Sequence, residues 1–243
     1  MRMIPDKVAL VTGGSQGIGL AIMHALLREG AFVVAVSRDA NNLKQALNAV
    51  DPQYQDHVTA IQADVRNEFE VHHAVQQVVS TYGRIDILIN SAGISMREKQ
   101  NLQDTDITEW NRMIDINLTG TYLMCREVLP FMKAQDMGYV INILSTASFR
   151  SGSGNGLYVA SKYGARALTE TIMEENRRTG VRVTSVSPGA VDSTIWNHKI
   201  EQITQEERST MLKTDDIASI VVYLVNLPPR VHIDNITVTP WYR

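Results

Sequence analysis

The sequence has little of what marks several classes of protein. It holds one cysteine, Cys125, so an intramolecular disulfide is excluded, and its apolar neighbours favour a small core residue of a reducing compartment. The 23 Lys and Arg nearly balance the 26 Asp and Glu, and no basic stripe suited to nucleic acid is visible. No apolar run approaches the ~18 residues of a membrane-spanning helix, and the first run is too short for a signal peptide. We therefore expect a cytoplasmic protein without nucleic-acid or membrane partners.

A metal site is also not expected. The six histidines are scattered along the chain, and the adjacent His72 and His73 point to different faces of any helix. Neither arrangement has the spacing that metal ligands require.

Short β-branched runs alternate with longer helical patterns through the 243 residues. The runs lie at 8–12, 32–36, 58–62, 85–90, 139–144, 181–187 and 233–239. Continuous apolar strands that alternate with helices predict a parallel sheet covered on both faces. We predict an α/β fold, a single Rossmann-like domain over residues 1–243 with a doubly wound parallel sheet of about seven strands. The segment 190–213 does not fit the alternation and is predicted to be a substrate lid.

Four glycines follow the first predicted strand, in "VALVTGGSQGIGLA". Gly13, Gly14, Gly17 and Gly19 stand between that strand and the first helix. Glycines there let the backbone approach a pyrophosphate, and a helix N-terminus offers free N–H groups with a partial positive charge. The spacing differs from G-x-G-x-x-G, but it still predicts a dinucleotide site.

Several motifs in order along the chain resemble those of the short-chain dehydrogenase/reductase family in its single-domain form. Thr12 to Gly19 matches the glycine-rich loop, and "NSAG" at 90–93 matches Asn-Asn-Ala-Gly with Ser91 in place of the second asparagine. Asp64-Val65 and Pro188-Gly189 match cofactor-contacting pairs. The matches to the family's catalytic set are Asn117, Ser145, Tyr158 and Lys162.

The resemblance implies a nicotinamide cofactor, which would supply the hydride chemistry. The residues expected to contact it are Gly13, Ser15, Gln16, Gly17, Ile18, Gly19, Ser37, Arg38, Asp64, Val65, Asn90, Ala92, Gly93, Tyr158, Lys162, Pro188, Gly189, Val191 and Thr194.

Tyr158 and Lys162 are one helical turn apart and therefore share a helix face. We expect Tyr158 to act as general acid in reduction and general base in oxidation, with the lysine ammonium favouring its anion. Ser145 would hydrogen-bond the substrate oxygen where charge develops. The resemblance implies that Lys162 also holds the nicotinamide ribose and that Asn117 holds a water linking Lys162 to solvent.

The end of the second strand predicts the cofactor's identity. An NAD site carries an acidic residue about 20 residues after the glycines, whereas this chain has Ser37 and Arg38 there. The planar guanidinium of Arg38 suits a 2′-phosphate, and Ser37 adds a hydroxyl. The alternative is that Asp39 binds the ribose, but it stands where it would cap the next helix. NADP(H) is therefore the expected cofactor.

The expected reaction is carbonyl reduction, or its reverse, on a small ketone, 3-oxo or 3-hydroxy acid or acyl substrate. Two alternatives stay open: an NAD-dependent sugar or polyol dehydrogenase, and a catalytically silent NADP-binding sensor. The apolar stretches at 107–132 and after Gly156 correspond to helices that pair across a two-fold axis in the family. A homo-oligomer is therefore expected, a tetramer rather than a dimer.

Overall fold

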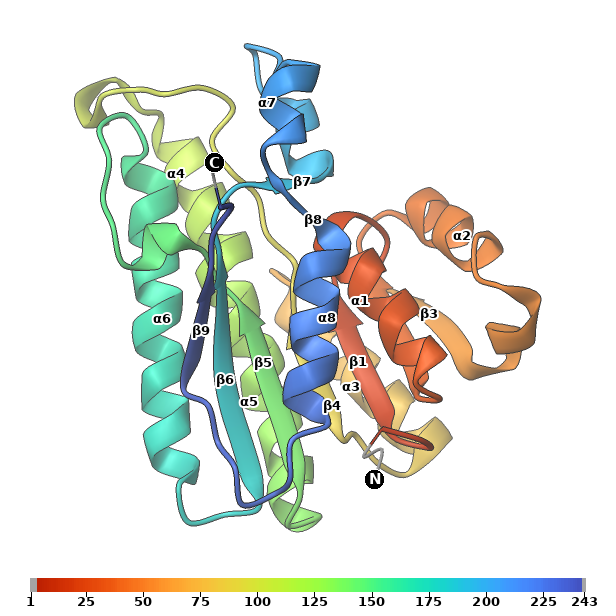
Figure 1. Cartoon of the computed structure of the whole chain (residues 1–243). Coiled ribbons are helices and arrows are strands. Elements are labelled where there is room, and N and C mark those ends of the chain that lie inside the picture. Colours follow the sequence, from red (N-terminus) through yellow and green to blue (C-terminus); the bar gives the residue numbers. More distant parts are fainter. Residues whose placement is uncertain (1–3, 242–243) are drawn as a thin grey trace.

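The computed structural model of this chain describes residues 4–241. Its centre is a seven-stranded sheet in the order β3-β2-β1-β4-β5-β6-β9, and all the pairs are parallel (Figure 1). The strands are β1 Val8–Thr12, β2 Phe32–Ser37, β3 Val58–Gln62, β4 Ile87–Asn90, β5 Gly138–Ile143, β6 Val181–Pro188 and β9 Asn235–Val238. The predicted Rossmann-like fold of about seven strands is confirmed.

Helices cover both faces of the sheet, as the apolar strands require. The helices are α1 Gly17–Arg28, α2 Ala40–Asn48, α3 Glu68–Tyr82, α4 Ile107–Ile114, α5 Gly120–Ala134, α6 Gly156–Asn176, α7 Gln205–Ser209 and α8 Thr214–Val225. Within β1, Ala9 and Val11 pack with α1, α2 and α8, whereas Val8 and Leu10 pack with α3, α5 and α6. Because successive strand residues point to opposite faces, one apolar strand serves two cores.

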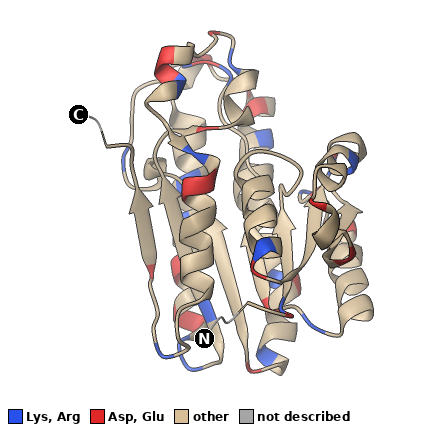
Figure 2. Cartoon of the chain, turned by 45° about the vertical axis from the view of Figure 1, so that its right-hand side comes forward, with Lys and Arg blue, Asp and Glu red and all other residues tan. Residues whose placement is uncertain are grey.

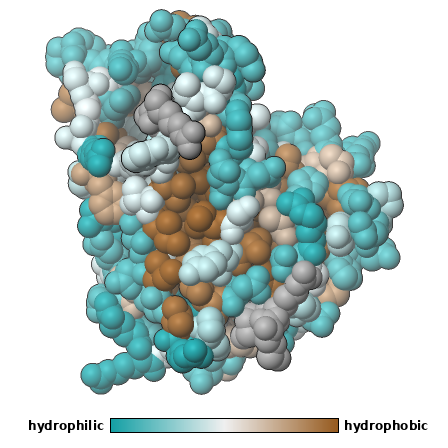
Figure 3. Space-filling model, in the orientation of Figure 1, coloured by the Kyte–Doolittle hydropathy of each residue, from teal (hydrophilic) through white to brown (hydrophobic). Residues whose placement is uncertain are grey.

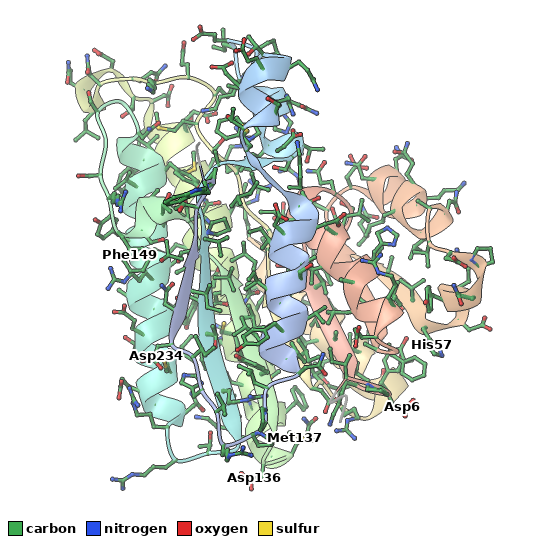
Figure 4. All side chains as sticks on the ribbon, in the orientation of Figure 1. Asp6, His57, Asp136, Met137, Phe149 and Asp234 are labelled. Atoms are coloured by element: carbon green, nitrogen blue, oxygen red, sulfur yellow. The ribbon has the colours of Figure 1, made fainter. Side chains whose placement is uncertain are left out.

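The chain order of the strands determines where a ligand can bind. The chain runs from β1 outward to β3 and then returns past β1 to β4, so a crevice opens between β1 and β4 at their carboxyl ends. His57 and Met137 directly precede β3 and β5, and both lie toward the lower end of the molecule in Figure 4, whereas Phe149, which follows β5, lies higher. The carboxyl ends therefore face the upper part of the molecule, where α7 lies.

Two segments depart from a plain alternation of strands and helices. Between α4 and α5, residues Asp115–Thr119 form a π-helical turn, an element that is rare and frequent at functional sites. The predicted lid segment contains a 3-10 helix at Thr194–His198, α7, and a two-stranded ladder of β7 Val191–Asp192 with β8 Leu212–Lys213. Asp192 binds both Arg208 and Lys213, at 2.8 and 3.1 Å, and so ties α7 to that ladder.

The described residues contain no helix long and apolar enough to cross a membrane. Across residues 4–241 there is likewise no cluster of three or more His, Cys, Asp or Glu side chains that could hold a metal ion. Cys125 is buried, and burial raises the pKa of its thiol to about 12, so it is an unreactive core residue.

Candidate active site

A cavity of about 610 Å³ opens at the carboxyl ends of the strands, a size typical of ligand sites. It is lined at one end by the glycine-rich turn and at the other by the first turn of α6 and the 3-10 helix of the lid segment. Every residue predicted to contact the cofactor lines this cavity, except Asn90. Ser145, Tyr158 and Lys162 line it too, whereas Asn117 does not.

The glycine-rich turn has a backbone conformation that side chains at its glycine positions would disrupt. Gly13 and Gly17 have φ of +67° and +56°, values that favour glycine. A Cβ at Gly19 would overlap the carbonyl oxygen of Gly13. No side chain caps the N-terminus of α1, so its first N–H groups are available to an anion in the cavity.

Gly19→Ala is expected to lower the free energy of unfolding by about 1–3 kcal/mol, because overpacking forces the backbone to move. The displaced turn should also weaken binding of a nicotinamide dinucleotide by at least about tenfold. Gly152→Ala is the matched control, since a Cβ at Gly152 meets nothing within 4 Å although the residue lines the same cavity. Urea unfolding and cofactor titration by fluorescence measure both effects, and equal behaviour of the two variants would contradict the prediction.

The end of β2 presents a hydroxyl and a cation to the cavity. Ser37 Oγ accepts a hydrogen bond from Ser15 Oγ at 2.9 Å, which joins β2 to the glycine-rich turn. Arg38 is exposed and lines the cavity, and it has no ion-pair partner among the residues that the structure describes. Asp39 caps α2 by accepting from the backbone N–H of Asn42 at 2.9 Å, which confirms the capping role expected for it.

Asp64 also lines the cavity, and its carboxylate is already engaged. Arg66 donates to both carboxylate oxygens, the shortest contact being 2.6 Å, and this hydrogen bonding holds the pKa of Asp64 below its usual value. The neighbouring Val65 is buried against the position where Gly120 has no side chain. Asp64 is therefore an oriented anion beside the cavity.

The two predicted residues outside the cavity lining lie directly behind its wall. Asn90 is buried and donates to Asn142 Oδ1 at 2.9 Å, and Asn142 in turn donates to Thr169 Oγ1. Asn117 accepts from the N–H of Ile94 at 2.9 Å and donates to its carbonyl at 3.0 Å. Asn90 therefore ties the end of β4 to β5, Asn117 holds the segment after β4 in place, and neither side chain lines the cavity.

Ser161 was not predicted from the sequence, yet it connects the site. It is fully buried, donates to the carbonyl of Tyr158 at 2.8 Å and accepts from Asn117 Nδ2 at 3.0 Å. Through Asn117, which also bonds the backbone of Ile94, it links the helix that carries Tyr158 to the loop after β4. The available signal was a small polar residue directly before Lys162 on the apolar side of a helix.

Ser145, Tyr158 and Lys162 come together at the end of β5 and the start of α6. Ser145 caps the short 3-10 helix at Thr146–Ser148 by accepting from the N–H of Ala147, and its side chain neighbours Tyr158 and acts to lower the pKa of the phenol. Lys162 Nζ lies 5.8 Å from the centroid of the Tyr158 ring and donates to the carbonyl of Ile143 at 3.2 Å. A hydroxyl, a phenol and an ammonium thus face one part of the cavity.

Burial moves the pKa values of the two titrating groups apart. It raises the pKa of Tyr158 above 10.0, an effect that the neighbouring Ser145 side chain only partly offsets, and it lowers the pKa of Lys162 from 10.5 to about 8. The sequence led us to expect that the ammonium favours the tyrosine anion. In the structure, loss of hydration outweighs that attraction, so Tyr158 carries its proton at neutral pH.

Lys162→Met should stabilise the chain at pH 7. Below pH 8 both the folded and the unfolded chain carry the charge, and the difference between the two pKa values corresponds to about 3 kcal/mol lost on burying it. From pH 8 to 10.5 the unfolded chain binds a proton that the folded chain lacks, so the wild type gains stability and the gap closes. Urea unfolding of both chains at pH 7 and 10 measures the difference between their free energies of unfolding. A difference that does not change with pH would contradict the lowered pKa of Lys162.

The fold and this cavity are those of a dinucleotide-binding oxidoreductase. The chain belongs to the short-chain dehydrogenase family, whose family model, described as short chain dehydrogenase, matches residues 7–204. A relative from Staphylococcus epidermidis, named as an uncharacterized oxidoreductase, is 35% identical over 240 residues, which are 99% of this chain and 100% of the relative.

Solved structures of similar chains agree with this family. An alcohol dehydrogenase from the archaeon Thermococcus sibiricus, complexed with 5-hydroxy-NADP, is 29% identical with a TM-score of 0.85 over 95% of each chain. The closed form of a serine dehydrogenase complexed with NADP+ is 28% identical with a TM-score of 0.87, over 95% of this chain and 93% of that one. A 3-ketoacyl-(acyl-carrier-protein) reductase from Brucella melitensis complexed with NADH is 27% identical with a TM-score of 0.86, over 97% and 98%.

Proposed function

We propose that this chain is an NADP(H)-dependent oxidoreductase that interconverts a carbonyl and an alcohol on a small ketone, a 3-oxo or 3-hydroxy acid or an acyl substrate. The observation that carries the proposal is the convergence of Ser145, Tyr158 and Lys162 on the cavity that the glycine-rich turn also lines. The uncapped N-terminus of α1 and the space kept free at Gly19 fit a pyrophosphate. Ser37 and Arg38 suit the 2′-phosphate of NADP(H).

The side chains then have distinct tasks. The cofactor, when bound, supplies or accepts the hydride. Tyr158 Oη gives its proton to the substrate oxygen in reduction, and its raised pKa keeps that proton in place beforehand. Ser145 Oγ hydrogen-bonds the same oxygen while negative charge develops on it. Lys162 holds the ribose hydroxyls, and Asn117 with Ser161 keeps the loop after β4 in position.

Turnover of NADPH with a panel of ketones, 3-oxo acids, ketoesters and sugars tests the proposal. Reduction of at least one carbonyl compound with NADPH supports it. Oxidation of sugars or polyols with NAD+ alone would favour the polyol dehydrogenase, and NADPH binding without turnover would favour a sensor.

The single buried cysteine suits a cytoplasmic enzyme.

We also propose that the chain assembles as a tetramer through two separate faces. Tyr122 of α5 and Tyr163 of α6 are 43% and 40% exposed, and Tyr223 of α8 is 55% exposed. Figure 3 shows an apolar area on the face where β9 and α8 lie in Figure 1, and there Ile236 and Val238 are only partly buried. Two self-complementary faces on one subunit give two two-fold axes, and the assembly closes at four copies when these axes meet at right angles.

Tyr223→Lys is expected to convert the tetramer into a dimer, since it places a charge in the face formed by α8 and β9 and leaves α5 and α6 untouched. Sedimentation velocity at micromolar concentration distinguishes the species by mass. A wild-type chain that sediments only as the 27.1 kDa monomer would contradict the assembly.

A further inference from the structure

The cavity is strongly positive although the chain as a whole is not. Among its lining residues, six are Lys or Arg and one, Asp64, is acidic, whereas the whole chain has 23 Lys and Arg against 26 Asp and Glu. Figure 2 shows the blue and red segments interspersed over the outside of the molecule. Positive charge is therefore in excess only around the cavity, where low-dielectric walls strengthen the electric field of these cations.

Half of these cations have evident tasks. Arg38 and Lys162 stand at the two ends of the proposed cofactor site, and Arg112 forms an ion pair with Glu109 at 3.2 Å. Asp64 is neutralised by Arg66. The remaining three are Lys99, Arg150 and Lys199, and within residues 4–241 none of them has an ion-pair partner.

The three unpaired cations come from three segments that are bonded to one another. The loop after β4 carries Lys99, and its Gln100 N–H donates to the carbonyl of Gly154 at 3.1 Å, in the loop that carries Arg150. On its other side, Arg97 accepts from the N–H of Ile200 at 3.1 Å, directly after Lys199 of the lid segment. The Lys99 side chain also fills the space beside Gly154, which has no Cβ.

These segments adjoin the first turn of α6, because the loop with Arg150 leads directly into that helix at Gly156 and all three cations line the cavity. Arg150 is eight residues before Tyr158, and Lys199 lies 5.6 Å from the ring centroid of Trp196, which also lines the cavity. Burial and the charge of Lys99 both lower the pKa of Lys199. The two ammonium groups therefore repel each other, and an anion between them would relieve that repulsion.

We propose that Lys99, Arg150 and Lys199 bind an acidic group that the substrate carries in addition to its carbonyl, a carboxylate or a phosphate, so that the substrate is an anion. The inference rests on the proposed function, because it places the reacting carbonyl at Tyr158. Since Lys199 belongs to the lid segment and Lys99 and Arg150 do not, the same acidic group would bridge the lid to the body of the cavity.

Matched substrate pairs test the inference. We compare acetoacetate with its methyl ester, and hydroxyacetone phosphate with hydroxyacetone, so the two arms separate carboxylate from phosphate. The wild type is expected to prefer the charged member of one pair at least tenfold in kcat/KM. Lys99→Gln combined with Lys199→Gln should reduce that preference tenfold or more, because charge-assisted hydrogen bonds are lost. Lys133→Gln, an exposed lysine of α5 outside the cavity lining, is the control and should keep the preference.

The result that overturns the inference is a wild type without preference for either charged member, or a double variant with the wild-type preference. If neither pair is turned over, the proposed function is in question while the inference is still tested by binding. Calorimetry with acetoacetate or hydroxyacetone phosphate, with NADP+ present, should then show affinity that the double variant weakens tenfold. Equal binding to both chains, or binding to neither, would overturn it.

Discussion

Tyr158→Phe is expected to lower kcat by about 10²–10⁴-fold, the usual contribution of a general acid or base. The substitution removes the hydroxyl that Ser145 contacts and keeps the ring that lines the cavity. The dissociation constant for NADPH should therefore change little while turnover falls. Steady-state kinetics on the best carbonyl substrate, with cofactor binding by fluorescence, separates the two quantities.

Tyr163→Phe is the matched control for this experiment. Tyr163 lies on the same helix, directly after Lys162, but it is 40% exposed and does not line the cavity. The control should keep wild-type kinetics at assay concentrations. A Tyr158 variant that also kept near wild-type kcat would remove the phenol from the mechanism, and a parallel loss of NADPH binding would point to a structural effect instead.

The second large effect is a reversal of cofactor preference. Wild-type kcat/KM should favour NADPH over NADH by about tenfold to over a hundredfold, the value of a hydrogen bond to a charged group. Ser37→Asp with Arg38→Ala should invert this ratio, because it removes the cation and introduces a carboxylate that repels a 2′-phosphate and accepts from a ribose hydroxyl. Asp39 is not expected to substitute for that carboxylate, because it caps α2 through the N–H of Asn42 and does not line the cavity.

Lys44→Ala controls for the loss of positive charge in this experiment. Lys44 is exposed on α2 and does not line the main cavity. Its variant should retain the wild-type ratio measured at the same ionic strength. Equal or better wild-type efficiency with NADH would show that Arg38 does not select the cofactor.

Most of the fold was predictable, because most strands of the main sheet are apolar runs and the glycines after β1 stand where the backbone turns. Those signals are local in sequence, and the observed strand order follows from the handedness of the connections. The site was predictable wherever a residue belongs to such a local pattern, as Gly19 and Ser37 do. Asn90 and Asn117 show the limit, since their contacts with Asn142 and Ile94 depend on distant segments.

The unpredicted features depend on burial and on loops that meet only in three dimensions. Spacing places Tyr158 and Lys162 on one face, but it does not show that both lose their hydration, which decides the direction of their pKa values. Lys99, Arg150 and Lys199 are likewise far apart in sequence, and no periodicity connects residues from three separate loops. Hydrogen bonds between the backbones of those segments bring the three residues together.

The π-helical turn at Asp115–Thr119 makes the length of the continuous helical rod from α4 to α5 critical. Met113 of α4 packs with Met96 and Leu157 beside the cavity, whereas Leu123 of α5 packs into the core against the sheet. A regular helix rotates by about 100° per residue, so deleting one residue of the turn would swing one apolar face away from its partner without unwinding either helix. Because this rod contains no loop, it should tolerate a change of length less well than the surface loops of the chain do.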